Sequence, residues 1–464
     1  MKFSKTLFSV LLCATFLVLT GIGVYCGGQQ PQTEGVLAVA KPFFDVGKQP
    51  DITMLINNSP WFPGFEKLVE LYEKQTGNVV KLDVTPYAGM LEKTRNALHS
   101  KESPYDIVNM DTQNTVEMYS GGLLTPIHEI DPNFELDPAV IGYDECHYWN
   151  PTKQWRTKNG GKLMGLPTNG NYQLYYYRAD LYQEAGLAPP ETWDDAIVAA
   201  EKMHDPPNLY GYVVRGARGN QIRFGWMPFM LGHNAGFVRD PANGDFTVTI
   251  NSPEAKQALD LYIELAERFG PPNSGAIAQS ELLQLMTTGK ALQLICVTAA
   301  WPHMDNPDTS LVVGKVGVTV NPKPTEGEHA SAIGNWIAGI PHNVSDEQKK
   351  GALAFMKWFL TYDAQYKYGE FGSVPVREDI FETDLAQKEE FRWMKAYKRT
   401  IPYAHQVLGY TEGPQLVEIS GLRLNQALIG ELSSAEALNL MAEEMHQVFL
   451  DSGRETGMLP KLPD

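Results

Sequence analysis

The first part of the chain alternates short apolar runs with stretches in which apolar residues recur every three or four positions. Apolar runs of strand length occupy 51–57, 79–84 and 106–110. Between them, 64–76 and 90–98 show the apolar spacing of amphipathic helices. Strands that alternate with helices in this way predict βαβ units and a parallel sheet.

The pattern changes at 165–171, a segment rich in glycine, proline and asparagine. It leads into the aromatic run 172–177, which predicts a buried strand because it has strand length and turn residues on both sides. Thr192, with Asp195 three residues later, predicts the N-terminus of the next helix. These features indicate a chain that leaves one structural unit, crosses a joint and enters another.

Beyond the joint, helices and strands are mixed, strands return at 292–340, and helices close the chain. The expected elements here are helices at 194–203, 254–269, 280–287 and 346–360 and strands at 210–216, 292–297, 313–320 and 335–340. The late return of strands predicts that the chain crosses back into the first unit. We therefore expect an α/β protein with two discontinuous lobes. Lobe 1 comprises 50–168 plus 291–341, and lobe 2 comprises 169–290 plus 342–464.

The first 26 residues differ from the rest of the chain. Lys2 and Lys5 precede an uncharged apolar run, which predicts a secretory signal or a retained anchor. Cys26 follows, ahead of a linker at 27–49, and this arrangement resembles a bacterial lipoprotein processing site. Tyr25 departs from that pattern, since a small residue is usual there. Lipidation of Cys26, plain secretion and a retained anchor stay open, and each implies an exported protein of the periplasm or the outer face of the cell membrane.

Length and charge narrow the class of protein further. A chain of 464 residues suits two domains, and its net charge of −17 argues against nucleic acid or an anionic membrane surface as a partner. After Cys26, the remaining cysteines are Cys146 and Cys296. A disulfide between them is possible, although two buried free thiols are the favoured interpretation.

Signals for catalysis are weak. The sequence has no phosphate-binding loop, dinucleotide fingerprint, serine nucleophile elbow or zinc-protease motif. The run Asp144–His147 contains four residues of metal-ligand type. Successive residues of a strand point to opposite faces, however, and the sequence has no second cluster of such residues to complete a metal site. We therefore expect no metal, no cofactor and no enzymatic activity. With 55 acidic residues, a carboxylate pair spaced for glycoside hydrolysis stays open, so a secreted carbohydrate-active enzyme is the alternative.

Signals for ligand binding are stronger, because several tryptophans fall in predicted turns and several polar residues fall at strand ends. Indole faces suit the apolar face of a sugar ring, and α/β sheets bind ligands at strand ends. Each residue could equally be a core, turn or surface residue. The candidate ligand-binding residues are Trp61, Tyr87, Asp111, Asn169, Asn171, Arg218, Trp226, Trp301, Asn335, Trp336 and Arg377.

Five segments carry a family resemblance: "GLP" at 165–167 followed by "RADLYQEAGLAPPETWDDA", "LMTTGKALQLICVTAAW" at 285–301, "VGVTVNPKP" at 316–324, "AIGNWIAGIP" at 332–341 and "EFGSVPVREDIF" at 370–381. Their order resembles that in the extracellular sugar-binding proteins of ABC transporters, the maltose-binding-protein-like group. Arg178 stands where that group usually has asparagine, and Asp195 where it usually has glutamate.

The resemblance implies a periplasmic-binding-protein-like fold whose discontinuous lobes enclose a ligand cleft. It implies a monomeric receptor that binds a di- or oligosaccharide and delivers it to the permease subunits of an ABC transporter. Trp301 matches the stacking position of that group best. Another solute, such as glycerol phosphate or a polyol, stays open, because an arginine fork from Arg218 or Arg377 would suit a phosphate or carboxylate.

Overall fold

The computed structural model describes residues 44–141 and 143–463. The expected signal, Cys26 and the first part of the expected linker lie outside the described residues. Within those residues, we find no helix whose length and hydropathy would allow it to cross a bilayer.

Five strands form the first sheet, in the order β2-β1-β3-β13-β6: β1 (Ile52–Asn57), β2 (Val80–Thr85), β3 (Ile107–Asp111), β6 (Gly165–Asn169) and β13 (Trp336–Gly339). The pairs β1–β2 and β1–β3 are parallel, as the alternating pattern predicts. β13 is antiparallel to both β3 and β6. A strand that lies more than 200 residues from β3 in sequence therefore completes this sheet.

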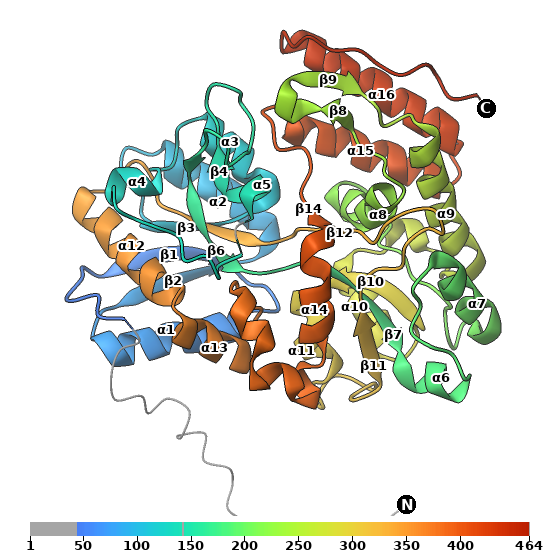
Figure 1. Cartoon of the computed structure of the whole chain (residues 1–464), viewed down its shortest axis with the longest axis horizontal. Coiled ribbons are helices and arrows are strands. Elements are labelled where there is room, and N and C mark those ends of the chain that lie inside the picture. Colours follow the sequence, from blue (N-terminus) through green and yellow to red (C-terminus); the bar gives the residue numbers. More distant parts are fainter. Residues whose placement is uncertain (1–43, 142, 464) are drawn as a thin grey trace, which may run out of the picture. The chain divides into compact units, whose positions relative to one another are not determined.

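Helices from two separate parts of the sequence, 62–147 and 346–370, lie around the first sheet (Figure 1). They are α1 (Phe62–Thr76), α2 (Tyr87–His99), α3 (Thr115–Ser120), α4 (Ile127–Ile130), α5 (Asp144–His147), α12 (Asp346–Phe359) and α13 (Tyr362–Glu370). Phe65 and Tyr72 on the buried face of α1 contact Phe359 and Trp358, with ring centroids 5.6 and 5.1 Å apart. Helices at 346–370 thus pack on the first lobe, whereas we expected 342–464 in the second.

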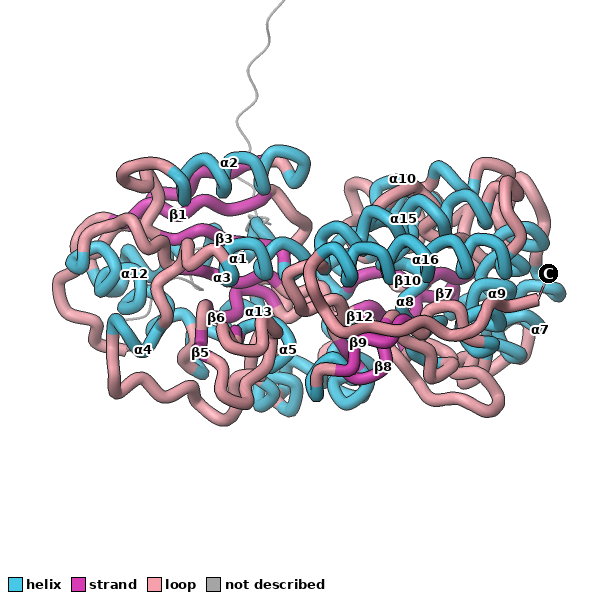
Figure 2. The backbone as a smooth tube through the Cα atoms, turned by 90° about the horizontal axis from the view of Figure 1, so that it is seen from above, coloured by secondary structure: helices cyan, strands magenta, loops and turns pink. Residues whose placement is uncertain are grey.

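The second sheet has three strands in the order β10-β7-β11: β7 (Gln173–Arg178), β10 (Gln293–Val297) and β11 (Val316–Thr319). Both neighbours of β7 are antiparallel to it. Helices α6 (Ala179–Glu184), α7 (Trp193–Met203), α8 (Asn220–Gly232), α9 (Pro253–Phe269), α10 (Gln279–Thr287), α11 (Trp301–Met304), α14 (Trp393–Thr400), α15 (Gly413–Leu428) and α16 (Ser434–Asp451) complete this lobe. Figure 2 shows the strands in two groups, with β1 and β3 in one and β7 and β10 in the other.

Local signals for helix ends agree with the structure. Thr192 and Asp195 form the expected capping box of α7, and Ser252 caps α9. The remaining strands form three short two-stranded sheets: β4 (Tyr148–Trp149) with β5 (Lys162–Leu163), β8 (Val238–Asp240) with β9 (Asp245–Val248), and β12 (Ser331–Ala332) with β14 (Ala404–His405).

The two cysteines of the described residues, Cys146 and Cys296, are free and buried, which is the interpretation that the sequence favours. Burial raises the pKa of each thiol to about 12.

We expected all of 291–341 to belong to the first lobe, but its strands divide between the two sheets. β10 and β11 pair with β7 in the second sheet, and β13 returns to the first. The expected strand at 210–216 forms isolated bridges, Tyr210 with Ala291 and Val213 with Leu294. An apolar run indicates that a strand is buried, but it carries no information about which sheet the strand joins, because every backbone offers the same hydrogen-bonding groups.

His147 links α5 to two strands of the first sheet. Its Nδ1 lies 3.0 Å from the backbone oxygen of Gly165, and its Nε2 lies 3.0 Å from the side-chain nitrogen of Asn335. These partners fit a neutral ring that donates from Nδ1 and accepts at Nε2. Burial lowers the pKa of His147 to about 4.

We expect His147 to make folding stability depend on pH between about 6.5 and 4. The unfolded chain binds a proton at this residue near pH 6.5, whereas the folded protein binds it near pH 4, so stability is lost as pH falls through this window. The loss is about 3 kcal/mol at full effect. Urea unfolding from pH 7 to 4 should show this slope in the native protein and in the surface variant His99→Gln, and a smaller slope in His147→Gln. Equal slopes in all three proteins would contradict the prediction.

Candidate functional site

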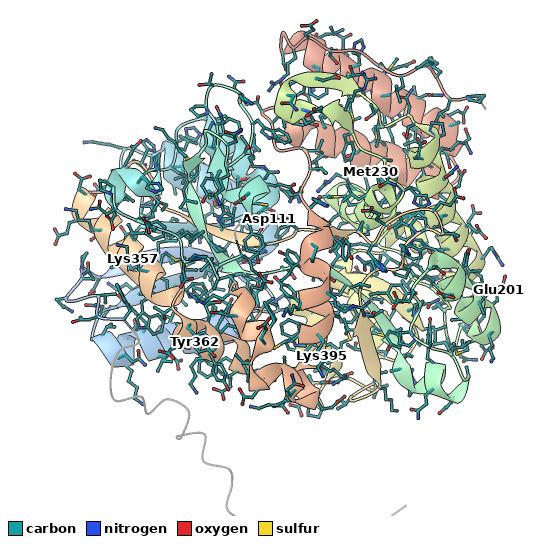
Figure 3. All side chains as sticks on the ribbon, viewed as in Figure 1. Asp111, Glu201, Met230, Lys357, Tyr362 and Lys395 are labelled. Atoms are coloured by element: carbon teal, nitrogen blue, oxygen red, sulfur yellow. The ribbon has the colours of Figure 1, made fainter. Side chains whose placement is uncertain are left out.

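A cavity of about 240 Å³ lies where the strand ends of the first sheet meet the start of α8. We call it the inner cavity. From the first lobe it is lined by Trp61 before α1, Tyr87 at the start of α2, Asp111 at the end of β3 and Trp336 at the start of β13. Parallel strands end at the same edge of a sheet, which explains why residues far apart in sequence gather here. Figure 3 labels Asp111 on the side of the first sheet that faces the second lobe.

Three aromatic side chains form one wall of the inner cavity. The rings of Trp61 and Trp336 are 6.3 Å apart between centroids, and those of Tyr87 and Trp336 are 6.0 Å apart. The indole N–H of Trp61 is buried and has no hydrogen-bond partner among the described residues. This wall offers apolar ring faces and one unused donor, a combination that suits a ligand with both apolar and polar surface.

Asp111 is the acidic group of the inner cavity. Its carboxylate accepts a hydrogen bond from the Tyr87 hydroxyl and another from the backbone N–H of Gln113, each at 3.0 Å. Burial raises its pKa above the ordinary range, and these two hydrogen bonds oppose that rise. The residue is thus fixed in place by its neighbours, with acceptor capacity left for a ligand hydroxyl.

The second lobe contributes basic and amide groups to the inner cavity. Arg215, Asn220 and Phe224 line it, the last two on α8. Arg223, also on α8, is fully buried and donates a hydrogen bond to the side-chain oxygen of Gln113 in the first lobe. Burial lowers the pKa of Arg223 to about 10. The Arg223–Gln113 hydrogen bond joins the two lobes beside the cavity.

A second space of about 490 Å³, the outer cavity, adjoins the inner one. It shares with the inner cavity the lining residues Tyr87, Asp111, Gln113, Asn220 and Trp336. It extends between α2, through Met90 and Thr94, and α15, through Pro414 and Glu418. A ligand longer than the inner cavity could therefore continue between the lobes.

Five of the eleven candidate residues line the inner cavity: Trp61, Tyr87, Asp111, Asn171 and Trp336. The other six are absent from its lining: Asn169, Arg218, Trp226, Trp301, Asn335 and Arg377. Most of these six make other contacts within the protein.

Trp301 packs in the second lobe, where its indole N–H donates to the backbone oxygen of Glu390 at 2.8 Å and Arg392 lies 4.2 Å from its ring. Trp226 is fully buried in the core of that lobe. Trp226 lies in the middle of α8, and Trp301 follows a strand end, a pattern that cannot distinguish a side chain in the core from one in a cavity.

The polar candidates outside the cavity also have structural surroundings. Arg377 forms ion pairs with Asp137 and Asp379, and Asn335 contacts His147. Asn169 is fully buried, with neither amide atom hydrogen-bonded within the described residues. Arg218 is exposed to solvent.

Sequence reasoning missed the basic side of the cavity. It selected Arg218 from the loop after 210–216, whereas the structure places Arg215, three residues earlier, in the inner cavity. The apolar run that precedes Arg215 made it look like part of a strand. Gln113 and Asn220 were also missed, although both lie directly after or at the start of an element, where ligand-binding residues are common.

Residues 57–366 match the family described as bacterial extracellular solute-binding protein. The match begins at the end of β1 and runs through both sheets to α13.

Individual relatives and solved structures resemble the chain over most of its length. The mannitol-binding protein of Pseudomonas aeruginosa is 23% identical over 436 residues, which cover 86% of this chain and 93% of that protein. A solute-binding protein of Agrobacterium radiobacter in complex with ribitol has a TM-score of 0.73 and 23% identity, covering 88% of this chain and 100% of that one. Maltose-bound MalE3 of T. maritima has a TM-score of 0.74 and 21% identity, covering 85% and 98%.

We expect Trp301→Ala to reduce the free energy of unfolding by about 3–5 kcal/mol, because it removes a large buried side chain and leaves the Glu390 oxygen without its donor. Urea unfolding followed by circular dichroism measures this change. A loss below about 1 kcal/mol would contradict a core position for Trp301 and would return it to the set of exposed, ligand-facing tryptophans.

Proposed function

Because the chain belongs to the bacterial extracellular solute-binding protein family, we propose that it is the exported receptor of an ABC import system. In this proposal it binds a sugar or polyol in the inner cavity and delivers it to the permease subunits. The observation that carries the proposal is the composition of the inner cavity. Aromatic faces from Trp61, Tyr87 and Trp336 lie beside the carboxylate of Asp111 and the guanidinium of Arg215.

Each part of a polyhydroxylated solute has a partner in this cavity. The C–H face of the solute packs on the indole of Trp336, and hydroxyl groups donate to Asp111 and accept from Arg215 and Asn220. Asn171, at the joint between the lobes, adds an amide. Since these groups come from both lobes, the solute stabilises the state in which the lobes are close together.

The size of the inner cavity favours a small solute. Its volume of about 240 Å³ lies below the usual range of about 300–1,000 Å³ for ligand pockets. One sugar or polyol unit fits there, and a di- or oligosaccharide would continue into the outer cavity. Similarity to the mannitol-binding protein and to the ribitol complex adds support for a polyol, which the sequence left as an alternative.

The enzymatic alternative has less support. Glycoside hydrolysis uses a pair of carboxyl groups that flank the scissile bond. Among the described residues, Asp111 is the carboxylate that lines the inner cavity, and the outer cavity adds Glu117, which is ion-paired with Arg95, and the exposed Glu418 on α15. A receptor, in contrast, can use a single carboxylate as a hydrogen-bond acceptor for a solute hydroxyl, and it releases the solute chemically unchanged.

Export is part of the same proposal. The N-terminal signal would bring the protein to the periplasm or the outer face of the cell membrane. Cys26, if lipidated, would supply the membrane anchor of a protein that otherwise acts as a monomer.

We expect tryptophan fluorescence of the mature protein to change saturably with one class among mannitol, ribitol, glucose, maltose and maltotriose. Trp336→Phe should weaken that binding by about tenfold or more, because it reduces the stacking surface in the cavity. Trp301→Phe is the matched control, since it also removes one buried indole but lies outside the cavity, and it should leave the affinity unchanged.

Chromatography of the bound solute after release should return it chemically unchanged. Two results would contradict the proposal: no response to any of these solutes, or equal weakening by Trp336→Phe and Trp301→Phe. Conversion of the solute would favour the enzymatic alternative.

A further inference from the structure

Three arginines lie close to Asp111 or to its neighbour Thr112, and among the described residues none of them forms an ion pair. Arg156 and Arg223 are almost fully buried, and Arg215, which is half-buried, lines the inner cavity. Within the described residues, no carboxylate oxygen lies within 4.0 Å of a side-chain nitrogen of any of the three. The charge of Asp111 acts on Arg215 and Arg223, and burial lowers the pKa of both. These three cationic side chains thus have no carboxylate at ion-pair distance among the described residues.

Elsewhere in the described chain, largely buried arginines have an acidic partner. The pairs are Arg178–Asp180, Arg377–Asp137, Arg392–Asp305, Arg423–Glu444 and Arg454–Glu412. Pairing is the usual arrangement because an isolated charge in a protein interior loses its hydration without compensation. The three arginines near Asp111 depart from the rule that the rest of this chain follows.

Two of the three arginines have neutral partners that account for their positions. Arg156 donates to the backbone oxygens of Thr112 and Val407 at 2.6 and 3.2 Å. Arg223 donates to the side-chain oxygens of Gln113 and Asn220. Both side chains hold elements of the two lobes together, which is a structural role.

Arg215 is different, because part of its guanidinium group is unused. Its Nε donates to Gln221, and the group lies 5.5 Å from the Phe224 ring. Its two terminal nitrogens make no hydrogen bond to any described residue. They belong to a side chain that lines the inner cavity, so a ligand there can receive two parallel hydrogen bonds from the fork.

The start of α8 adds to the positive character of the same wall. Asn220 and Gln221, the first two residues of the helix, line the inner cavity. Gly219 precedes them with φ of +84° and provides no side-chain cap for the helix. The free N–H groups and the helix dipole at such an end favour a nearby anion.

We propose that the solute of the inner cavity carries an anionic group, a carboxylate or a phosphate, which binds to the terminal nitrogens of Arg215. This inference rests on the proposed function and narrows its substrate class to sugar acids, polyol acids or their phosphate esters. The hydroxyl groups of the solute lie towards Asp111 and Tyr87, and its anionic end lies towards Arg215 and the start of α8. The anion supplies the negative charge that the three arginines lack.

The test compares matched anionic and neutral solutes by isothermal titration calorimetry on the mature protein. The pairs are gluconate and sorbitol, glucuronate and glucose, and glycerol 3-phosphate and glycerol. We expect at least one anion to bind about 10- to 100-fold more tightly than its neutral partner, the range expected for a charge-assisted hydrogen-bonded pair. The first two pairs report on a carboxylate and the third on a phosphate.

Variants of Arg215 test whether this residue causes the preference for an anionic solute. Arg215→Gln should bring the affinity for the anion within about threefold of that for its neutral partner, and Arg215→Lys should give an intermediate loss because it keeps the charge but not the fork. Arg218→Gln, an exposed arginine three residues away, is the control and should bind like the native protein. Circular dichroism and thermal melting establish that each variant is folded. If Arg215→Gln does not fold, Arg215→Lys and the native solute pairs still decide the question.

The outcomes separate this inference from the proposed function. If neutral sugars or polyols bind as tightly as the matched anions, or more tightly, the proposal of an anionic solute is wrong, whereas the proposed function as a sugar or polyol receptor is supported. If acetate or inorganic phosphate binds as tightly as the polyhydroxylated anions, the sugar or polyol assignment is wrong and Arg215 remains the anion site. If none of these compounds binds, both are wrong. Selectivity for an anion that persists in Arg215→Gln would also overturn the role given to Arg215.

Discussion

The antiparallel pairing of β13 with β3 is the contact on which the rest of this structure depends. It places Trp336 opposite Asp111 in the register, so the aromatic wall and the acidic group of the inner cavity share one pair of strands. The same pairing draws a segment from the last third of the chain into the first sheet and brings α12 and α13 behind it to pack on α1. Without it, the first sheet would end in an open edge at β3, and the cavity would lose one side.

Contacts between the lobes follow from this arrangement. β3 ends at Asp111 and the chain turns through Gln113, which meets Arg223 from α8. Arg156, in the segment before β6, donates to the backbone oxygens of Thr112 and Val407, which belong to widely separated parts of the chain. The residues that bind across the lobes are thus neighbours of those that line the cavity, so any change in the distance between the lobes changes the cavity as well.

Much of the local structure could be predicted from the sequence, because it depends on short-range rules. The βαβ start, the capping box of Thr192 and Asp195 and the cap at Ser252 each depend on residues within a few positions of one another. Asp111 could be identified as a site candidate because it directly follows a predicted strand. These features need no knowledge of the partner elements.

The rest could not be predicted, because it depends on which distant segments meet. The apolar runs of β10 and β13 look alike in sequence, but one joins β7 and the other joins β3. Trp301 and Trp336 both adjoin strand ends, and only the packing of 389–392 against Trp301 decides that its indole lies in core. Arg215 and Arg218 differ by three positions in one loop, and the approach of α8 decides which of them faces the cavity.

The charge distribution links these long-range contacts to ligand binding. Arg215 and Arg223 come from the second lobe, whereas Asp111 comes from the first, so bringing the lobes together moves two cations towards one carboxylate. Coulomb interactions strengthen as water leaves, both the attraction to Asp111 and the repulsion among the arginines. Hydrogen bonds to Gln113 and Asn220 offset part of that repulsion but carry no opposite charge. A solute that brings its own negative charge would therefore stabilise the close arrangement of the lobes more than a neutral one of the same shape, because it adds an attraction to the arginines of the second lobe.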